Sequence, residues 1–502
     1  MVRPPAVTRG EVAKGAGLAG LARLGAAIEL LAQPLYIWLF GLATYGIYVV
    51  LWAAVNLVTN LIDLSMNFAL QRIVPTAGDE ARAHGAVKAA LLVTVGPAML
   101  IALLVSLNAG AVAGIFSAAP EDEARLGTAV ALFVWALPLW TFVEVATSAA
   151  RARRAFGPEI RLRIFWEQVA RILFALGFFA LGLGSLGLML AHLASLALTA
   201  ALCVPLLARF YYLRLLVTAP VGGAPLRDLI GTGAALVPAN LSRRMLIDAP
   251  PVVLNLLLPG AQGAAAAGLF EIARKLSTLP NIVRQSFQYV LAPLASAQAH
   301  ADRAQIGAIY SFSSRISTAL VVPLAGLLAF AGRDVLSVYR PEAMAALPLL
   351  YVLVAARAVE AAAAPASTIV EMTGHRGLPL LNSLIGAAVW ALLALWLVPG
   401  MGTLGMAIAV AVATVAMPWA AAIELKASDG LSPFDRPVLK CLLIALPGVG
   451  LMGLTEYLTG GPLRFAVVHL IWGATTWLTL RHGLPREDRE ALGAFARKLR
   501  LV

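Results

Sequence analysis

The stretch GAAAAGLFEIARKLSTLPNIVRQSFQYVLAP, from Gly263 to Pro293, is long enough to cross a lipid bilayer and yet carries a continuous line of polar side chains. These polar residues recur at steps of three and four: Glu271, Arg274, Lys275, Thr278, Asn281, Gln285 and Gln288. At 3.6 residues per turn they lie on one face of a helix whose other faces are apolar. A charge at the bilayer centre costs at least about 2.5 kcal/mol, so this face requires a bundle interior or a water-filled cavity.

The composition of the whole chain predicts an all-α, polytopic membrane protein. Of its 502 residues, 60% are apolar and 13% are charged, whereas charged residues make up roughly 25% of a soluble protein. The net charge of +12 comes from basic residues scattered over short loops, a pattern that indicates membrane orientation and not nucleic-acid binding. Cys203 and Cys441 lie far apart in apolar segments, without a metal-binding motif around them. We therefore expect no disulfide, no metal and no cofactor.

We predict about fourteen transmembrane helices, because a hydrocarbon core about 30 Å thick needs about 20 mainly apolar residues per helix. The expected spans are 18–40, 44–72, 86–107, 126–149, 164–182, 186–208, 229–257, 263–291, 308–330, 345–370, 378–398, 403–424, 438–457 and 463–481. Each boundary is defined to within about four residues.

Lysine and arginine fall mainly in alternate loops, which predicts that both termini are cytoplasmic. One side receives the cluster of arginines between Arg151 and Arg163, whereas the other holds the acidic run Glu121-Asp122-Glu123. The basic tail after residue 481 is expected to form a short amphipathic helix that binds anionic lipids. No loop is long enough to build a catalytic domain, which argues against a membrane glycosyltransferase or polymerase and against an enzyme in general.

Two parts of the chain resemble each other. Thr44-Tyr45-Gly46-Ile47-Tyr48 corresponds to Ala266-Ala267-Gly268-Leu269-Phe270, and each precedes a polar-striped helix that ends near a proline. Internal repeats of this kind build the central pathway of many transporters.

The polar residues of the membrane concentrate in four expected helices, those of spans 18–40, 44–72, 229–257 and 263–291. The second of these carries a stripe of its own: Asn56, Thr59, Asn60, Asp63, Asn67 and Gln71. The first and third contribute further polar groups: Arg23, Glu29, Gln33, Tyr36, Asn240, Arg243, Arg244, Asp248 and Asn255. Such aligned groups favour a hydrated path, whereas Glu167–Arg171 and Arg357–Glu360 have the spacing of structural ion pairs within one helix.

With these two pairs set aside, arginine dominates the remaining intramembrane charges. The basic residues are Arg23, Arg243, Arg244, Arg274, Lys275, Arg284 and Arg315, and the acidic residues are Glu29, Asp63, Glu144, Asp248 and Glu271. The planar fork of arginine binds phosphate bidentately. A modestly cationic cavity suits a polyprenyl-diphosphate headgroup with attached sugars, whereas a cation exporter would need carboxylates that face the cavity.

The run LFGLATYGIYVVLWAAVNLVTNLIDLSMNFALQRIVP, from Leu39 to Pro75, resembles the opening of Wzx-type polysaccharide-export flippases. These belong to the multidrug/oligosaccharidyl-lipid/polysaccharide (MOP) superfamily. The segment FEIARKLSTLPNIVRQSFQYVLAPLA resembles the eighth helix of the related lipid II flippases, including a basic residue five positions before a proline, here Lys275 before Pro280. Those flippases have an acidic residue just before that basic one, where this chain has Arg274. This departure counts against lipid II itself as the substrate.

The resemblance implies two pseudo-symmetric six-helix lobes, 1–217 and 218–424, two further helices in 425–481, and a cytoplasmic basic tail, 482–502. It implies a flippase in the bacterial cytoplasmic membrane that moves an undecaprenyl-diphosphate-linked oligosaccharide to the periplasmic leaflet by alternating access. Its partners would be this lipid-linked oligosaccharide, membrane lipids and a coupling ion, H⁺ or Na⁺. An ion-coupled multidrug exporter of the same superfamily is the alternative.

We expect the cavity residues to be Arg23, Asn60, Arg244, Arg274, Lys275 and Gln285, and the ion-coupling candidates to be Glu29 and Asp63. The identity of the sugars and of the coupling ion stays open, as does the question of which of Arg274 and Lys275 faces the cavity.

Overall fold

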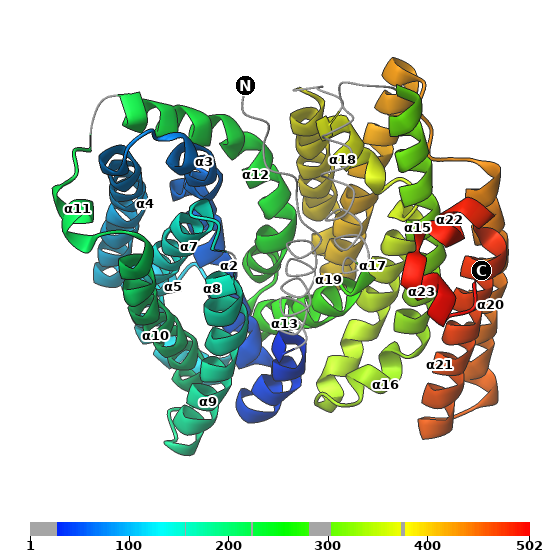
Figure 1. Ribbon diagram of the computed structural model, residues 1–502. Helices are drawn as coiled ribbons and strands as arrows, with labels where there is room; N and C mark the ends of the chain where they lie inside the picture. Colours follow the sequence, from blue (N-terminus) through cyan, green and yellow to red (C-terminus); the bar gives the residue numbers. More distant parts are fainter. Residues whose placement is uncertain (1–27, 156, 222–223, 281–302, 373–376, 502) are drawn as a thin grey trace. The chain divides into compact units, whose positions relative to one another are not determined.

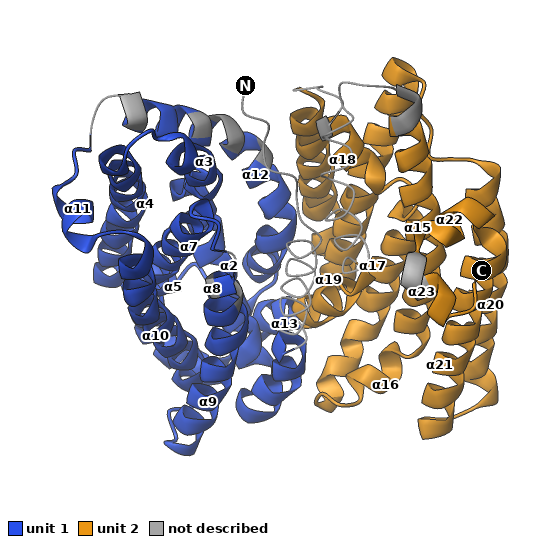
Figure 2. Cartoon of the chain, viewed as in Figure 1, with its two compact units in different colours: residues 1–268 blue, residues 269–502 orange. Residues whose placement is uncertain are grey.

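The structure is a computed structural model, and it describes residues 28–155, 157–221, 224–280, 303–372 and 377–501 (Figure 1). All the regular elements within these ranges are helical. The chain forms two compact units, Met1–Gly268 and Leu269–Val502 (Figure 2). The two six-helix lobes that we expect from the sequence, residues 1–217 and 218–424, remain a proposal.

Unit 1 begins with the helix Ile28–Phe40. The elements that follow are α2 (Leu42–Ile62), α3 (Met66–Ile73), η1 (Val74–Thr76), α4 (Glu80–Leu107), α5 (Ala109–Ala113), α6 (Pro120–Phe133), α7 (Ala136–Ala152), α8 (Gly157–Glu159), η2 (Ile160–Trp166), α9 (Glu167–Ala180), α10 (Leu186–Phe210), α11 (Leu213–Thr218), α12 (Ala224–Leu257) and the first half of α13 (Gly260–Ser277). The segment η2 is a π-helix that continues into α9.

The expected single helix over residues 44–72 is wrong in one respect, because the structure divides it into α2 and α3. The chain turns at Leu64 and Ser65, whose φ angles of 46° and 57° are left-handed and strained for residues other than glycine. The α12 helix contacts this break directly, since a Cβ on Gly233 would lie 2.2 Å from the Leu64 carbonyl oxygen. Close packing by a distant helix therefore holds a turn that the local sequence does not favour.

The two glycines of the internal repeat meet each other inside unit 1. A Cβ on Gly268 would lie 3.3 Å from the Gly46 Cα, and a Cβ on Gly46 would lie 1.8 Å from the Ala264 carbonyl oxygen. Because Gly46 and Gly268 have no side chains, the backbones of α2 and α13 can approach each other closely, as small residues permit in membrane helices.

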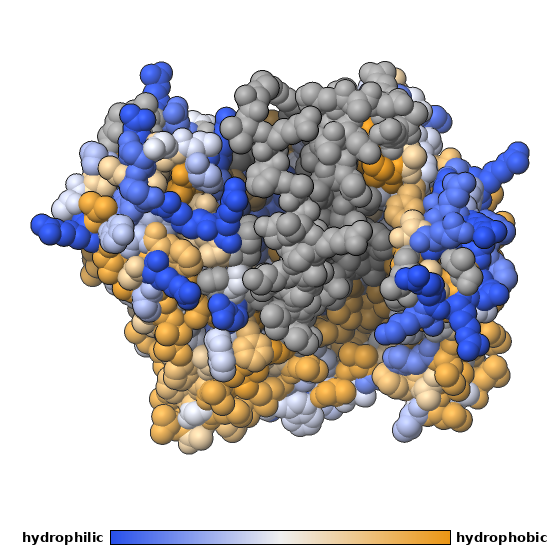
Figure 3. Space-filling view, in the orientation of Figure 1, coloured by the Kyte–Doolittle hydropathy of each residue, from blue (hydrophilic) through white to orange (hydrophobic). Residues whose placement is uncertain are grey.

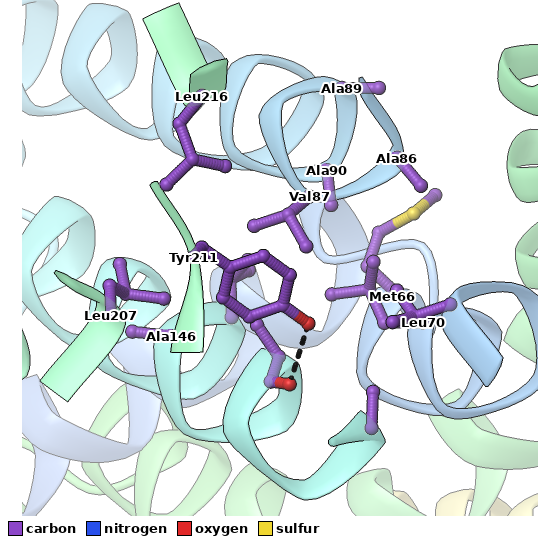
Figure 4. Packing of buried hydrophobic residues seen from close by; sticks show 14 of the residues in the cluster. Met66, Leu70, Ala86, Val87, Ala89, Ala90, Ala146, Leu207, Tyr211 and Leu216 are labelled. Atoms are coloured by element: carbon purple, nitrogen blue, oxygen red, sulfur yellow. Dashed lines mark hydrogen bonds between the residues drawn. The ribbon is translucent and has the colours of Figure 1, made fainter. Parts of the chain in front are cut away.

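A core cluster of unit 1 packs alanine-rich faces of α4 and α7 against α3 and α10 (Figure 4). Ala86, Ala90, Ala146 and Met66 are fully buried there. Just after α10, the Tyr211 hydroxyl donates a hydrogen bond of 2.9 Å to the Ala149 carbonyl (Figure 4). Burial raises the pKa of Tyr211 to about 12, so the hydroxyl keeps the proton that it donates.

Unit 2 contains the end of α13 and the C-terminal helices. These are α15 (Arg303–Phe330), α16 (Gly332–Leu336), η3 (Pro341–Ala346), α17 (Leu347–Glu360), α18 (Pro365–Met372), α19 (Leu378–Asp429), α20 (Arg436–Leu458), α21 (Gly461–Leu478), η4 (Thr479–Gly483), α22 (Arg486–Ala491) and α23 (Gly493–Lys498). The element α19 consists of two helices, and the chain comes back on itself between them, since a Cβ on Gly405 would lie 2.5 Å from the Leu397 carbonyl oxygen. It breaks at Gly402, where φ is 55° and ψ is −130°, between the two spans that we expect there.

The C-terminal tail packs on unit 2, in two short helices and not in the one amphipathic helix that we expect. Leu501 is 1% exposed and belongs to a core cluster with Ile316 of α15 and Cys441 of α20. Asp488 of α22 accepts a hydrogen bond of 2.9 Å from the Arg315 guanidinium. The tail is therefore part of the unit's core, while its basic side chains Arg497 and Lys498 stay exposed.

The surface confirms that the chain is a multi-pass membrane protein. Nine helical stretches within the described ranges are long and apolar enough to cross a membrane. Each expected span contains helix in its described part, but the structure divides 126–149 between α6 and α7, and 345–370 between α17 and α18, as it divides 44–72. Leu92, Leu100 and Leu107 of α4 are among the large apolar side chains that lie exposed. In Figure 3, apolar side chains cover the lower part of the visible face of each unit, and hydrophilic side chains gather above them.

Candidate functional site

A polar seam joins α12 to the N-terminal helices of unit 1. We use this name for Gly233, Asn240, Asp248 and Asn255, which follow each other at steps of seven and eight and so share one face of α12. Asn240 donates to the Ser65 hydroxyl at 2.9 Å, and Asp248 accepts from the Asn60 amide at 3.4 Å. Hydrogen bonds between membrane helices are worth only about 0.6–2 kcal/mol each. The seam can therefore hold α12 in place and still come apart.

The seam ends in a double hydrogen bond between Asn255 and the backbone of Ser117. The Asn255 side chain is fully buried. Its carbonyl oxygen accepts from the Ser117 N–H at 2.9 Å, and its amide donates to the Ser117 carbonyl at 2.6 Å. Nearby in the chain, Asp122 of α6 accepts a hydrogen bond of 2.9 Å from the Thr44 hydroxyl of α2. These bonds fasten the loop between α5 and α6 to α12 and α2.

Arg244 lies between Asn240 and Asp248 on the seam face, and yet its side chain is exposed, as is that of Arg243. If α12 crosses the membrane, as the sequence predicts for residues 229–257, exposed arginines in it require water around them, because lipid would leave the charges unsolvated. Arg244 is also within electrostatic range of Asp63, which follows the last residue of α2. The structure thus brings together three residues that the sequence predicts for the site, Asn60, Asp63 and Arg244.

A chain of ionic contacts begins beside Asp63 and leads away from the break between α2 and α3. Glu144 of α7 accepts from the Asn67 amide at 3.4 Å and from Arg163 Nη2 at 2.8 Å. Arg163 also lies 3.4 Å from Glu159, whose other oxygen is 3.0 Å from Arg151. The sequence places Glu144 among the unpaired membrane charges, but the structure pairs it with this arginine at the start of the next span.

Glu29 lies in a different polar cluster of unit 1. Its charge acts on Glu167 and Arg171 of α9, which form the ion pair within one helix that their spacing predicts. Close by, the Gln33 amide donates to the Tyr45 hydroxyl at 2.8 Å, and Tyr48 is hydrogen-bonded to His192 at 3.0 Å. Arg163 acts on both Glu167 and Asp63, so the charges around the two ion-coupling candidates, Glu29 and Asp63, are connected through this arginine.

In unit 2, Arg274 and Lys275 share one acidic neighbour on the same helix. Arg274 grips Glu271 through two hydrogen bonds of 2.8 and 2.7 Å, and Lys275 Nζ lies 3.6 Å from the same carboxylate. Glu271 is buried, whereas both basic side chains are half-buried. The three side chains therefore form one ionic cluster on α13.

The expectation that Arg315 contributes an unbalanced positive charge is wrong. Its guanidinium lies 2.6 Å from Asp435, the N-cap residue of α20, and 2.9 Å from Asp488. The Arg357–Glu360 pair forms as its spacing predicts, at 3.0 Å. Arg23 and Gln285, both expected to line the cavity, lie outside the residues that the structure describes.

The helical bundles and their buried polar networks define the class of protein, a polytopic membrane protein with the fold of MOP transporters. One similar structure is the lipid II flippase MurJ in an inward closed conformation, with a TM-score of 0.73 and 11% sequence identity, over 92% of this chain and 97% of that one. Another is a multidrug resistance MATE family transporter in an inward-facing conformation, with a TM-score of 0.64 and 12% identity, over 82% of this chain and 96% of that one.

A third similar structure is a MOP superfamily transporter from Pyrococcus furiosus, described by the reverse polarity of its binding pocket. The TM-score is 0.54 at 13% identity, and the match covers 80% of this chain and 92% of that one. The sequence has no significant match among curated proteins. The model of the polysaccharide biosynthesis protein family matches residues 39–339, more than half of the chain. The chain belongs to this family, and it shares the fold of the transporters named above.

Proposed function

We propose that the protein is a flippase that moves an undecaprenyl-diphosphate-linked oligosaccharide from the cytoplasmic to the periplasmic leaflet of the bacterial cytoplasmic membrane. Its product would feed the synthesis of a surface polysaccharide, such as lipopolysaccharide or exopolysaccharide. On this proposal the protein is a transporter and not an enzyme. Membership of the polysaccharide biosynthesis protein family supports the substrate class, and the MOP fold supports translocation.

The proposal depends mainly on the exposed Arg244, which acts electrostatically on Asp63. A guanidinium held in a membrane protein by amide-bearing helices suits a diphosphate, because its fork donates two parallel hydrogen bonds to phosphate oxygens. The amides of Asn60 and Asn240 suit sugar hydroxyls, since an amide both donates and accepts hydrogen bonds. We assign Arg23, Arg274, Lys275 and Gln285 to the same substrate path.

Alternating access would separate α12 from α2 along the polar seam. The lobes would then be residues 1–217 and 218–424, with residues 425–481 and the tail 482–502 outside the moving parts. The distribution of lysine and arginine supports cytoplasmic N- and C-termini. In this orientation Ser117 and Asn255 lie on the periplasmic side, and the break at Leu64 and Ser65 faces the cytoplasm. Asp63 and Glu29 are the candidates for coupling transport to H⁺ or Na⁺.

Replacing Arg244 and Lys275 together by alanine tests the assignment. We expect the double variant to reach the membrane at the normal level and to produce no surface polysaccharide, because the cations that hold the diphosphate are gone. The measurement is the amount of surface polysaccharide, determined by gel electrophoresis and lectin staining. The strain carries the variant as its only copy of the gene. Arg486→Ala, which removes an exposed arginine of the tail, is the matched control. Normal polymer output from the double variant would refute the assignment.

Multidrug export is the second candidate, because MATE transporters are among the similar structures. An aromatic cluster of α2, α6 and α10 could suit organic cations, with Trp52 lying 4.2 Å from His192 between ring centroids. However, Phe133 and His192 are buried within this cluster and offer little surface to a ligand. An exporter predicts that deletion of the gene sensitises cells to cationic drugs while the surface polysaccharide stays unchanged. The flippase predicts the reverse pattern.

A further inference from the structure

Two buried carboxylates stand at the start of the ionic chain in unit 1. Asp63 is 5% exposed and Glu144 is 6% exposed, and they lie close enough to repel each other electrostatically. Asn67 lies between them, because its N–H faces Asp63 and its side-chain amide donates to Glu144. Within the described part of the chain, Asp63 Oδ1 has no hydrogen-bond partner. A buried acceptor without a partner is costly, and a bound cation would remove that cost.

Within the ranges that the structure describes, the buried charges around this pair are mainly acidic. The groups that face Asp63 are Glu144 from α7, Arg163 from η2 and Arg244 from α12. Arg163 is engaged with Glu144, and Arg244 is exposed, so water screens its charge. Among the described residues, Asp248 of α12 is also acidic and accepts from Asn60, and Arg163 also faces the carboxylate of Glu167 in α9. Two buried carboxylates thus share one partly buried guanidinium, which leaves room for one further positive charge.

We propose that Asp63 and Glu144 together bind one monovalent cation, H⁺ or Na⁺, and that the Arg163 guanidinium moves when this site binds or releases the cation. The inference rests on the ion-coupled transport proposed above and names the residues that would carry the coupling. Asp63 supplies the oxygen without a partner, Glu144 supplies the second carboxylate, and Asn67 holds the two together.

Arg163 has two alternative partners, which makes it suited to report a change at Glu144. Its Nη2 lies 2.8 Å from Glu144, and its Nη1 lies 3.4 Å from Glu159. A cation that neutralises Glu144 weakens the first contact, so the guanidinium moves toward Glu159 and competes there with Arg151. Arg163 lies in the π-helical segment η2, and π-helical turns occur frequently at functional sites. Binding of the cation thus changes the ionic contacts of the segment between α7 and α9, which contains α8 and η2.

Trp140 offers a spectroscopic reporter, because the Arg163 guanidinium lies 4.1 Å from the centroid of its ring. A guanidinium that leaves this ring changes the fluorescence of the tryptophan. The experiment uses the purified full-length protein in detergent, and subtracts the emission of the Trp140→Phe variant to isolate the signal of Trp140. One arm lowers the pH from about 8 to about 5 without sodium, a range in which perturbed carboxylates titrate. The other arm adds NaCl at the higher pH, with choline chloride as the ionic-strength control.

We expect a sigmoidal change in one of the two arms, which identifies the cation. Asp63→Asn and Glu144→Gln should each abolish it, whereas Glu80→Gln, which removes an acidic partner of Arg153 outside this network, should preserve it. If Glu144→Gln does not fold, Asp63→Asn carries the test alone, because its amide keeps the shape of the carboxylate. A flat response of the wild-type protein in both arms, or a transition that survives Asp63→Asn, overturns the inference. Because no substrate is present, the result is independent of whether the protein moves a lipid-linked oligosaccharide.

Discussion

At the scale of single residues, the structure assigns different tasks to chemically similar groups. Arg244 is exposed beside Asp63, Arg163 bridges two carboxylates, and Arg315 ties the tail to α20. The sequence alone separates local pairs such as Arg357–Glu360 from the rest, because their spacing on one helix is enough. It does not find the partners of Arg315, since Asp435 and Asp488 lie far away in the chain. Pairing across helices depends on tertiary packing, which spacing does not encode.

Gly46 gives the sharpest prediction at this scale. Gly46→Ala should reduce the stability of the folded protein by about 1–3 kcal/mol or abolish folding, because the new methyl group would meet backbone atoms that cannot rotate away. The measurement is thermal unfolding of the detergent-solubilised protein, followed by size-exclusion chromatography. Gly177→Ala is the control, since a Cβ there has open space. Equal melting temperatures of the two variants would contradict the close approach of α2 and α13.

At the scale of elements, the positions of the helices follow from the sequence, whereas their irregularities do not. Hydropathy predicts where each span runs because the bilayer imposes its length. The break at Leu64 and Ser65 escapes such a pattern, because neither residue favours a left-handed backbone. The break depends on α12, whose Gly233 lies against Leu64. As a result, the polar stripe expected on one helix is divided, with Asn60 directed to Asp248 and Asn67 to Glu144.

The polar seam of α12 should open more readily when the two hydrogen bonds between Asn255 and Ser117 are removed. Asn255→Ala deletes both hydrogen bonds to Ser117, so we expect a cysteine at position 117 to react several-fold faster with a membrane-impermeant maleimide added outside intact cells. The background carries Cys203→Ala and Cys441→Ala, which remove the two native thiols. Asn108→Ala is the matched control, because that side chain bonds only within its own helix end. An unchanged labelling rate would show that the hydrogen bonds of Asn255 do not restrain the loop between α5 and α6.

At the scale of the whole molecule, sequence and structure agree on an all-helical, multi-pass membrane protein, and the family match places it with polysaccharide biosynthesis proteins. Composition alone predicts this much, because few proteins are 60% apolar without spanning a membrane. The sequence does not predict the polar networks within each unit, since they join residues up to 188 positions apart. The central claim, translocation of a diphosphate-linked oligosaccharide, unites the family, the fold and the exposed arginine of α12.

Reconstitution into liposomes tests this claim most directly. The purified protein is incorporated into vesicles with a fluorescent undecaprenyl-diphosphate oligosaccharide, and dithionite quenching measures how fast the inner-leaflet lipid reaches the outside. We predict rapid transfer by the wild-type protein, slow transfer by Arg244→Ala, and no acceleration for the same oligosaccharide on undecaprenol without the diphosphate. Equal rates for protein-containing and empty vesicles, or equal transfer of the lipid without the diphosphate, would contradict the account.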